Sequence, residues 1–214
     1  MNAVAQTSRE RAWWLRAFLV LQAPTAVFAA LRNPAEEDLD ARSEPLVAIG
    51  FLAGIAGVLS SALAGHALDS FDGGLTTVVA WAIFAGGLYG LFAVWLGGLV
   101  IHAVARRLGS RGSYRRARHV VGFALAPVAL SLLLLWPVRL ALYGEDLFRR
   151  GGNDAGATGS RVLDLLTIAA GAWALALLLV GVRAVHGWTW ARAAATVAAA
   201  AVLPVLLAVA QALL

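Results

Sequence analysis

Cysteine is absent from this 214-residue chain, and so is lysine, so that all seventeen basic residues are arginine. The lack of cysteine excludes disulfides, thiolate metal sites and cysteine nucleophiles. Charged residues are also scarce, at 14% of the chain, whereas soluble globular domains carry about 25%. Because 61% of the residues are hydrophobic, too few polar groups remain to cover a water-exposed surface. The composition therefore excludes an ordinary soluble domain, and its bias towards Arg, Ala, Gly and Leu indicates a GC-rich, bacterial genome.

The apolar residues occur in long runs, which predicts an all-α integral membrane protein. A helix needs about 20 apolar residues to cross the hydrocarbon core of a bilayer. Five segments reach that length, and we expect them to form a bundle of five transmembrane helices: residues 46–68, 75–105, 118–139, 163–182 and 193–214. The second run is longer than one span requires, so it must tilt, bend at Gly86-Gly87 or extend into the membrane interface.

Residues 11–32 are apolar but too short to be predicted as a span. Only fifteen residues separate Arg16 from Arg32, and they include Gln22 and Pro24. We expect an amphipathic helix on the membrane surface, and a sixth crossing is the alternative. One face of that helix would carry Trp14, Phe18, Leu21, Phe28 and Leu31. An acidic linker, residues 33–44, follows, so that residues 1–44 are expected to form a cytoplasmic N-terminal region ahead of a membrane domain, residues 45–214.

The arginines are distributed unevenly over the predicted loops. Alternate loops carry thirteen and four of them. The positive-inside rule then places the N-terminus in the cytoplasm and the C-terminus outside, in a multi-pass protein of the cell membrane.

The most basic loop is the candidate functional site. Its arginines, together with one tyrosine, are candidates to contact anionic lipid headgroups or an acidic partner: Arg106, Arg107, Arg111, Tyr114, Arg115, Arg116 and Arg118. The simpler interpretation is that the arginines only hold the loop inside. Because the arginines adjoin apolar spans, we expect them to contact membrane lipids, a membrane protein or a second copy of the chain. We expect no nucleic acid partner.

Motifs of enzyme and metal sites are missing from the sequence. His66, His102, His119 and His186 lie near span ends, without ligand spacing, and are expected to be interfacial. No GxSxG surrounds a serine. Arg139, at the end of the third span, is expected to snorkel or to pair with Glu145 or Asp146. We therefore predict a protein that is not an enzyme and needs no cofactor.

Proline and small residues give the remaining signals. Prolines inside a helix should bend it, and the candidates are Pro127 and Pro137 in the third span and Pro204 in the fifth. Together with Gly122, these prolines either only shape their helices or line a polar cleft. Small residues recur along the first two spans and predict close helix packing, within the chain or in a dimer: Gly50, Gly54, Gly57, Ser61 and Gly65, then Ala82, Gly86, Gly90, Ala93 and Gly97.

Three stretches resemble the Yip1 domain family. They are Gly112-Ser113-Tyr114 followed by Gly122-Phe123 and Pro127, then HGWTWARAAATVAAAAVLP at residues 186–204, and QAPTAVFAALRNP at residues 22–34. Phe123 stands where the family often has tyrosine. The resemblance implies a five-span protein with its N-terminus inside; eukaryotic relatives are implicated in vesicle traffic and in binding small GTPases. The leading functional hypothesis is a membrane scaffold that organises partners or lipids through its arginine loops, and the alternative is a small permease or lipid-translocating protein.

Overall fold

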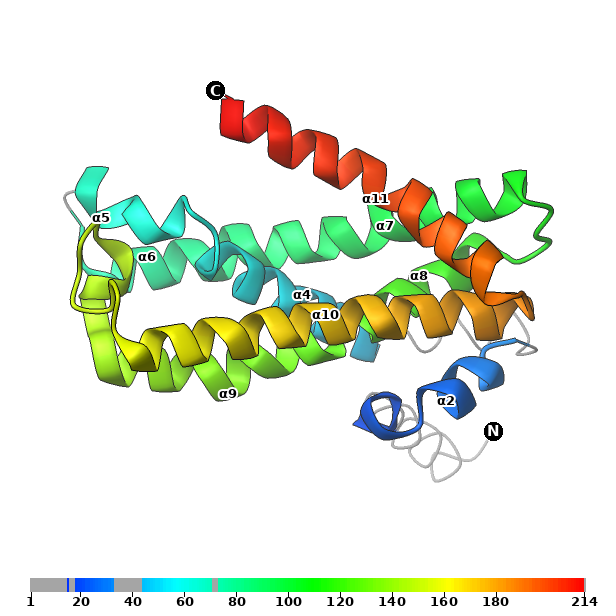
Figure 1. The fold of residues 1–214 in the computed structure, drawn as a ribbon, viewed down its shortest axis with the longest axis horizontal. Helices are drawn as coiled ribbons and strands as arrows, with labels where there is room; N and C mark the ends of the chain where they lie inside the picture. Colours follow the sequence, from blue (N-terminus) through cyan, green and yellow to red (C-terminus); the bar gives the residue numbers. More distant parts are fainter. Residues whose placement is uncertain (1–14, 16–17, 33–43, 71–72, 214) are drawn as a thin grey trace, which may run out of the picture. The chain divides into compact units, whose positions relative to one another are not determined.

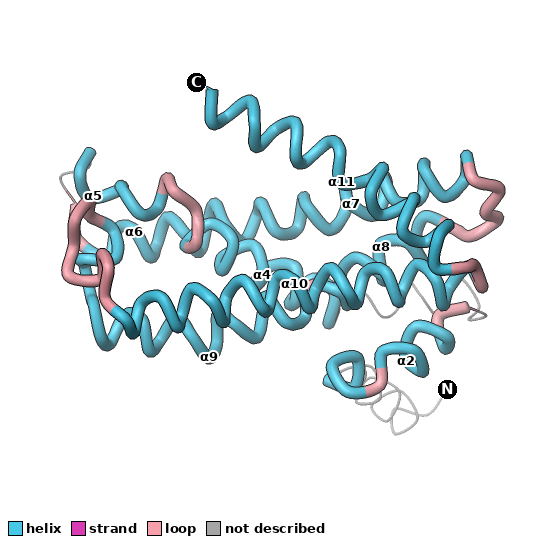
Figure 2. The backbone as a smooth tube through the Cα atoms, in the orientation of Figure 1, coloured by secondary structure: helices cyan, strands magenta, loops and turns pink. Residues whose placement is uncertain are grey.

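The computed structural model describes residues 15, 18–32, 44–70 and 73–213, without the side chains of residues 44, 70 and 203–213. These residues form helices joined by turns, and no strand occurs among them (Figure 2). The elements in chain order are α2 (Pro24–Ala30), α4 (Glu44–Leu59), the 3₁₀ turn η1 (Ala64–His66), α5 (Ala67–Ser70), α6 (Leu75–Trp81), the π-helical turn η2 (Ala82–Gly86), α7 (Gly87–Arg107), α8 (Tyr114–Ala124), α9 (Ala126–Tyr143), the 3₁₀ turn η3 (Gly144–Phe148), α10 (Thr158–His186) and α11 (Trp190–Leu213) (Figure 1).

Four stretches of the described chain are long and apolar enough to cross a membrane. They are Pro45–Asp69, Leu75–Arg107, Tyr114–Phe148 and Thr158–His186, and each contains or closely matches one of the first four predicted spans. Helix α11 runs to Leu213, but its described apolar part is Trp190–Val202. The fifth span therefore stays a prediction.

The N-terminal segment is helical in two short pieces over its described part. Residues 18–22 and α2 are separated at Ala23, whose φ of −131° is not helical. Pro24 follows, and its ring and missing N–H favour the start of a new helix. Phe28 and Leu31 are buried, whereas Phe18 is exposed. The single amphipathic face expected over residues 11–32 is therefore not confirmed, and Trp14 lies outside the described residues.

The chain divides into two compact units. Unit 1 contains residues 1–46, 94–124 and 175–214, and unit 2 contains residues 47–93 and 125–174. The helices α4, α7 and α10 contribute residues to both units.

Unit 2 is organised around a close contact between the backbones of α4 and α7. A side chain on Gly54 would collide with the backbone of Gly86 and Gly90, and one on Gly90 would collide with Gly50. Gly87 lies in the same way against the ring of Phe51. The small-residue pattern of the first two spans thus predicted a helix contact within the chain, as observed. Gly57 and Gly65 take no part, because a side chain on either would meet nothing.

The long second span changes its helix type at the predicted glycine pair. The π-helical turn η2 ends at Gly86, and the α-helical pattern resumes at Gly87. A π turn holds one extra residue in the helix and, where it occurs, is mostly a single turn inside an α-helix. Trp136 and Phe148 lie 6.3 Å apart as stacked rings. They close the apolar core of unit 2 around Ile55 and Leu59.

The third span is interrupted beside Pro127: α8 ends at Ala124, and α9 begins at Ala126 with Pro127 in its first turn. A proline fits the first turn, where its missing N–H has no helical partner. Pro137 lies inside α9, which continues to Tyr143, and Pro204 lies inside α11.

Arg139 has a different partner from the one expected. Its guanidinium group donates to Asp164 Oδ1 at 2.7 Å and to Thr167 Oγ1 at 3.1 Å, both on α10, and lies 5.6 Å from the centre of the Trp136 ring. Glu145, one of the two expected partners, instead faces Arg149 and accepts a hydrogen bond from the Leu75 amide. Sequence proximity favoured the loop acids, but α9 and α10 pack so that Arg139 faces Asp164.

Candidate functional site

The arginine loop between α7 and α8 is fixed to the end of α10. After α7 ends at Arg107, Gly109 reverses the chain with a φ of +87°, a left-handed conformation that glycine adopts without steric cost. Ser110 Oγ accepts a hydrogen bond from the Gly112 amide at 2.9 Å and lies 2.9 Å from His186 Nδ1. The Ser110 hydroxyl therefore joins this loop to the last residue of α10.

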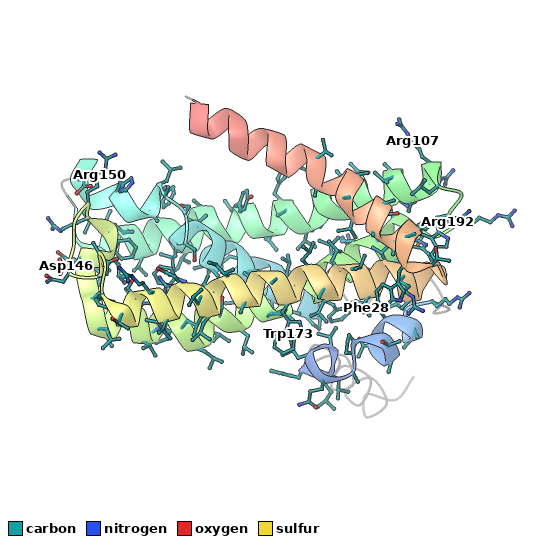
Figure 3. The ribbon with its side chains drawn as sticks, viewed as in Figure 1. Phe28, Arg107, Asp146, Arg150, Trp173 and Arg192 are labelled. Atoms are coloured by element: carbon teal, nitrogen blue, oxygen red, sulfur yellow. The ribbon has the colours of Figure 1, made fainter. Side chains whose placement is uncertain are left out.

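The predicted loop arginines fall into two groups. Arg106, Arg107 and Arg111 are exposed, and Arg107 projects away from its helix (Figure 3). Arg115, Arg116 and Arg118, on the first two turns of α8, are half-buried. The loop thus presents one set of guanidinium groups to its surroundings and holds a second set against its own helices.

Arg118 is held by aromatic rings. Its guanidinium carbon lies 5.0 Å from the centre of the Trp95 ring and 5.9 Å from that of Tyr114. The Tyr114 hydroxyl donates to the Trp95 carbonyl at 3.0 Å. A side chain on Gly98 would lie only 2.8 Å from the Arg118 Cα, so this glycine allows α8 to approach α7. The tyrosine of the predicted site therefore positions an arginine by a cation–π contact and also links two helices.

The turn between α10 and α11 repeats this arrangement. The Arg183 guanidinium lies 4.4 Å from the centre of the Trp190 ring, and the rings of His186 and Trp188 stack at 4.6 Å. Gly187 has a φ of +63°, and a side chain on it would lie 2.8 Å from the guanidinium of Arg32.

These turn residues were missing from the predicted site. The sequence HGWTWAR, with two tryptophans between Arg183 and Arg192 near the end of a span, is the signal that would have identified them. Trp95 carries no such signal, because it lies inside an apolar run.

His119 differs from its prediction as an interfacial side chain. It is fully buried, and its Nδ1 lies 2.9 Å from the Arg115 carbonyl of its own helix. No cluster of three or more His, Asp or Glu side chains suited to a metal ion occurs within the described part of the chain. His119 is therefore part of the packed interior of unit 1.

Parts of the three stretches that resemble the Yip1 family lie together in unit 1: Gly112 lies against the His186 ring, and Gly187 lies against Arg32. Gly122 of α8 packs against the Leu46 side chain. Phe28 of α2 and Val120 of α8 both lie against Gly181 of α10, and Figure 3 shows Phe28 between α2 and α10. The lack of a side chain at Gly122 therefore gives the Leu46 side chain room against α8.

Two of the three segments of unit 1 carry positive charge only. Its segments 94–124 and 175–214 contain eight arginines and no aspartate or glutamate. Ring faces attract guanidinium groups but do not neutralise them. Arg115 and Arg116 also lie in the first turn of α8, where the helix dipole is already positive. Chemically, this arrangement suits an anionic partner with oxygen acceptors.

The comparisons with known proteins agree with the observed helices. The family model described as Yip1 domain matches residues 8–212, nearly the whole chain. No curated protein and no solved structure matches the chain significantly. With four helices long and apolar enough to cross a membrane and a match over almost its full length, this chain is a multi-pass membrane protein that belongs to the Yip1 domain family.

Proposed function

We propose that this protein is a non-enzymatic scaffold with five spans in the cell membrane, which organises acidic partners through its arginine loop on the cytoplasmic side. The 24-residue length of α11 supports a fifth span, because about 20 residues suffice to cross the hydrocarbon core. The excess of arginine in alternate loops supports a cytoplasmic N-terminus and an external C-terminus.

The observation that carries this proposal is the presentation of Arg106, Arg107 and Arg111. All three are exposed, and the loop that carries Arg111 is anchored through Ser110 to His186. Anchoring lowers the entropy that the loop loses when a partner binds. The absence of carboxylates from residues 94–124 leaves this charge for an acidic protein segment or lipid surface.

The alternative of a small permease has no specific support in the described residues. Buried polar side chains there bond back to their own helices: Ser131 Oγ donates to the Val128 carbonyl, and Thr196 Oγ1 to the Arg192 carbonyl. Such bonds satisfy hydroxyl groups within a helix. They are typical of packed spans.

The test compares two triple variants that remove the same charge. Arg106→Gln, Arg107→Gln and Arg111→Gln change the exposed loop, and Arg149→Gln, Arg150→Gln and Arg161→Gln change unit 2. Each full-length chain is purified from its native membrane after cross-linking, and the proteins and lipids retained are quantified by mass spectrometry. We expect the loop variant to lose specific acidic partners and the unit 2 variant to keep them.

Equal retention by both variants, in protein that elutes as a single species, would contradict the scaffold proposal. The side of the loop is measured in the same membranes. Because the chain has no cysteine, Arg111→Cys and Leu214→Cys each introduce a single thiol for membrane-impermeant labelling. The proposal requires these two thiols to face opposite compartments.

A further inference from the structure

Three guanidinium groups from three segments are associated with one turn of unit 1, the turn between α10 and α11. Arg183 of α10 lies over Trp190, and Arg32 lies against Gly187. Arg116 lies in the first turn of α8, and Gly112, just before that helix, packs against the His186 ring. We call Arg32, Arg116, Arg183, His186, Trp188 and Trp190 the basic–aromatic turn.

Helix register brings α8 to this turn. Gly112, just before α8, packs against the His186 ring, and Val120 of α8 packs against Gly181 of α10. The two helices are therefore antiparallel here. These two contacts place Arg116 at the level of the last turn of α10, which contains Arg183.

The inner nitrogens of two of these arginines lack acceptors. Nε of Arg116 and Nε of Arg183 are buried and form no hydrogen bond with any residue that the structure describes. A buried charged donor without an acceptor is costly. The Trp190 ring covers one face of the Arg183 guanidinium, which leaves the N–H groups in the plane of that guanidinium as the donors for a ligand.

The chemistry that fits is a phosphate group. Its oxygens accept parallel N–H bonds from guanidinium groups, and one such anion can accept from more than one arginine. Arg183 lies three residues before the end of an apolar stretch suited to crossing a membrane, and Trp190 is half exposed. Tryptophan and arginine at this position in a span face the headgroup layer. The source of the phosphate is therefore a lipid.

We propose that the basic–aromatic turn binds the phosphate headgroup of an anionic phospholipid, one molecule per chain, through Arg116 and Arg183. This inference deepens the proposed scaffold function, because it assigns a lipid to the inner arginines and leaves the outer arginines to other acidic partners.

The experiment measures retained lipid by native mass spectrometry. The full-length chain is purified in detergent and titrated with phosphatidylglycerol, with phosphatidylcholine as the zwitterionic reference. We expect one tightly retained phosphatidylglycerol on the wild type. The double variant Arg116→Gln and Arg183→Gln should weaken its retention by about tenfold or more, because it removes charge-assisted bonds to phosphate.

The matched control is Arg106→Gln with Arg107→Gln, which removes the same charge from exposed positions of unit 1. It should leave the single retained lipid in place. Trp190→Leu keeps every arginine but removes the ring over Arg183, and it should weaken retention by a smaller factor. Arg183→Lys, which preserves the charge, serves as the folding check: it should remain monodisperse and retain lipid better than Arg183→Gln.

Four outcomes would overturn the proposal. In the first, the wild type retains both lipids equally; in the second, the exposed control loses the lipid as much as the double variant does. In the third, millimolar inorganic phosphate displaces the lipid and is retained in its place. In the fourth, the chain binds lipid only after the acidic residues within 36–40 have been neutralised. If lipid retention fails this test but the Arg106, Arg107 and Arg111 variant still loses its acidic partners, only the lipid site is wrong. If the lipid site passes but that variant keeps its partners, the scaffold proposal is wrong and the lipid site stands.

Discussion

Arginine is used differently in the two units. In unit 2, Arg139 and Arg149 face carboxylates, and Asp69 accepts hydrogen bonds from the Arg150 amide. In unit 1, Arg118 and Arg183 lie over aromatic rings, and segments 94–124 and 175–214 contain no carboxylate at all. The described arginines of unit 2 are therefore paired largely with carboxylates of the same unit. Arg118 and Arg183 of unit 1 are instead held in position by aromatic rings.

The packing of the two units differs as well. Unit 2 brings two helix backbones together at Gly50, Gly54, Gly86 and Gly90. Unit 1 fills its interior with large side chains, among them Phe28, Phe123 and His119. Backbone contact tolerates no added atom, whereas side chains adjust their rotamers, so the two units should respond differently to small substitutions.

The largest effect is expected from Gly90→Ala. The added methyl group would overlap the Gly50 carbonyl and the Gly54 backbone, and the helices must separate to accept it. We expect the free energy of unfolding to fall by about 2 kcal/mol or more. The measurement is thermal unfolding in detergent, followed by size-exclusion chromatography.

Gly57→Ala is the matched control, because a side chain on Gly57 meets nothing. It should change stability by less than about 1 kcal/mol, in the stabilising direction that alanine favours in helices. If both substitutions had the same effect, the distinction between backbone and side-chain packing would be wrong.

An intermediate effect is expected from Asp164→Asn. The Arg139 side chain is 11% exposed and that of Asp164 is 55% exposed, so Arg139 would lose its charged partner while remaining mostly buried. We expect the free energy of unfolding to fall by about 1–2 kcal/mol. This is less than for a fully buried pair, because Asp164 is about half exposed. Equilibrium unfolding of the single variants and of the double variant with Arg139→Gln gives the coupling energy.

Arg149→Gln tests the same chemistry at an exposed pair, since both side chains there are about half exposed. A change of no more than about 0.5 kcal/mol is expected. A coupling energy for Arg139 and Asp164 that is equally small would mean that unit 2 does not depend on its ion pairs.

The most local effect on stability is expected from Ser110→Ala, which removes the link between the arginine loop and His186. The cost is about 1 kcal/mol and is confined to the loop. Limited trypsin digestion in nanodiscs should therefore cleave after Arg111 about fivefold faster, because cleavage follows the population of the open loop.

Ser113→Ala changes the same kind of side chain in the same loop. The Ser113 hydroxyl forms no hydrogen bond with the described residues, so this variant should be cleaved at the wild-type rate. Equal acceleration in both variants would show that Ser110 does not anchor the loop.

Much of the architecture was predictable from the sequence, for reasons that concern the bilayer. Long apolar runs, such as residues 163–182, have one stable conformation in lipid, because an unpaired backbone is too costly there. The glycine spacing at Gly50, Gly54, Gly86 and Gly90 predicted a close helix contact. The length of the second run left tilting, bending at Gly86-Gly87 and extension into the interface open, and the structure shows a π-helical turn that ends at Gly86.

The partners of the polar side chains were not predictable. Loop proximity suggested Glu145 or Asp146 for Arg139, but the partner is Asp164, 25 residues away. His119 at the start of a span suggested an interfacial position, but the helix face on which it lies is buried.

The sequence by itself determined the membrane environment, the helices and the arginine-rich loops, because these depend on composition and on spacing along one chain. Only the tertiary structure decided that Arg118 lies over Trp95, that Arg183 lies over Trp190 and that Ser110 meets His186. Such contacts depend on how helices are rotated and shifted against one another, and that register is determined by packing across residues far apart in the sequence.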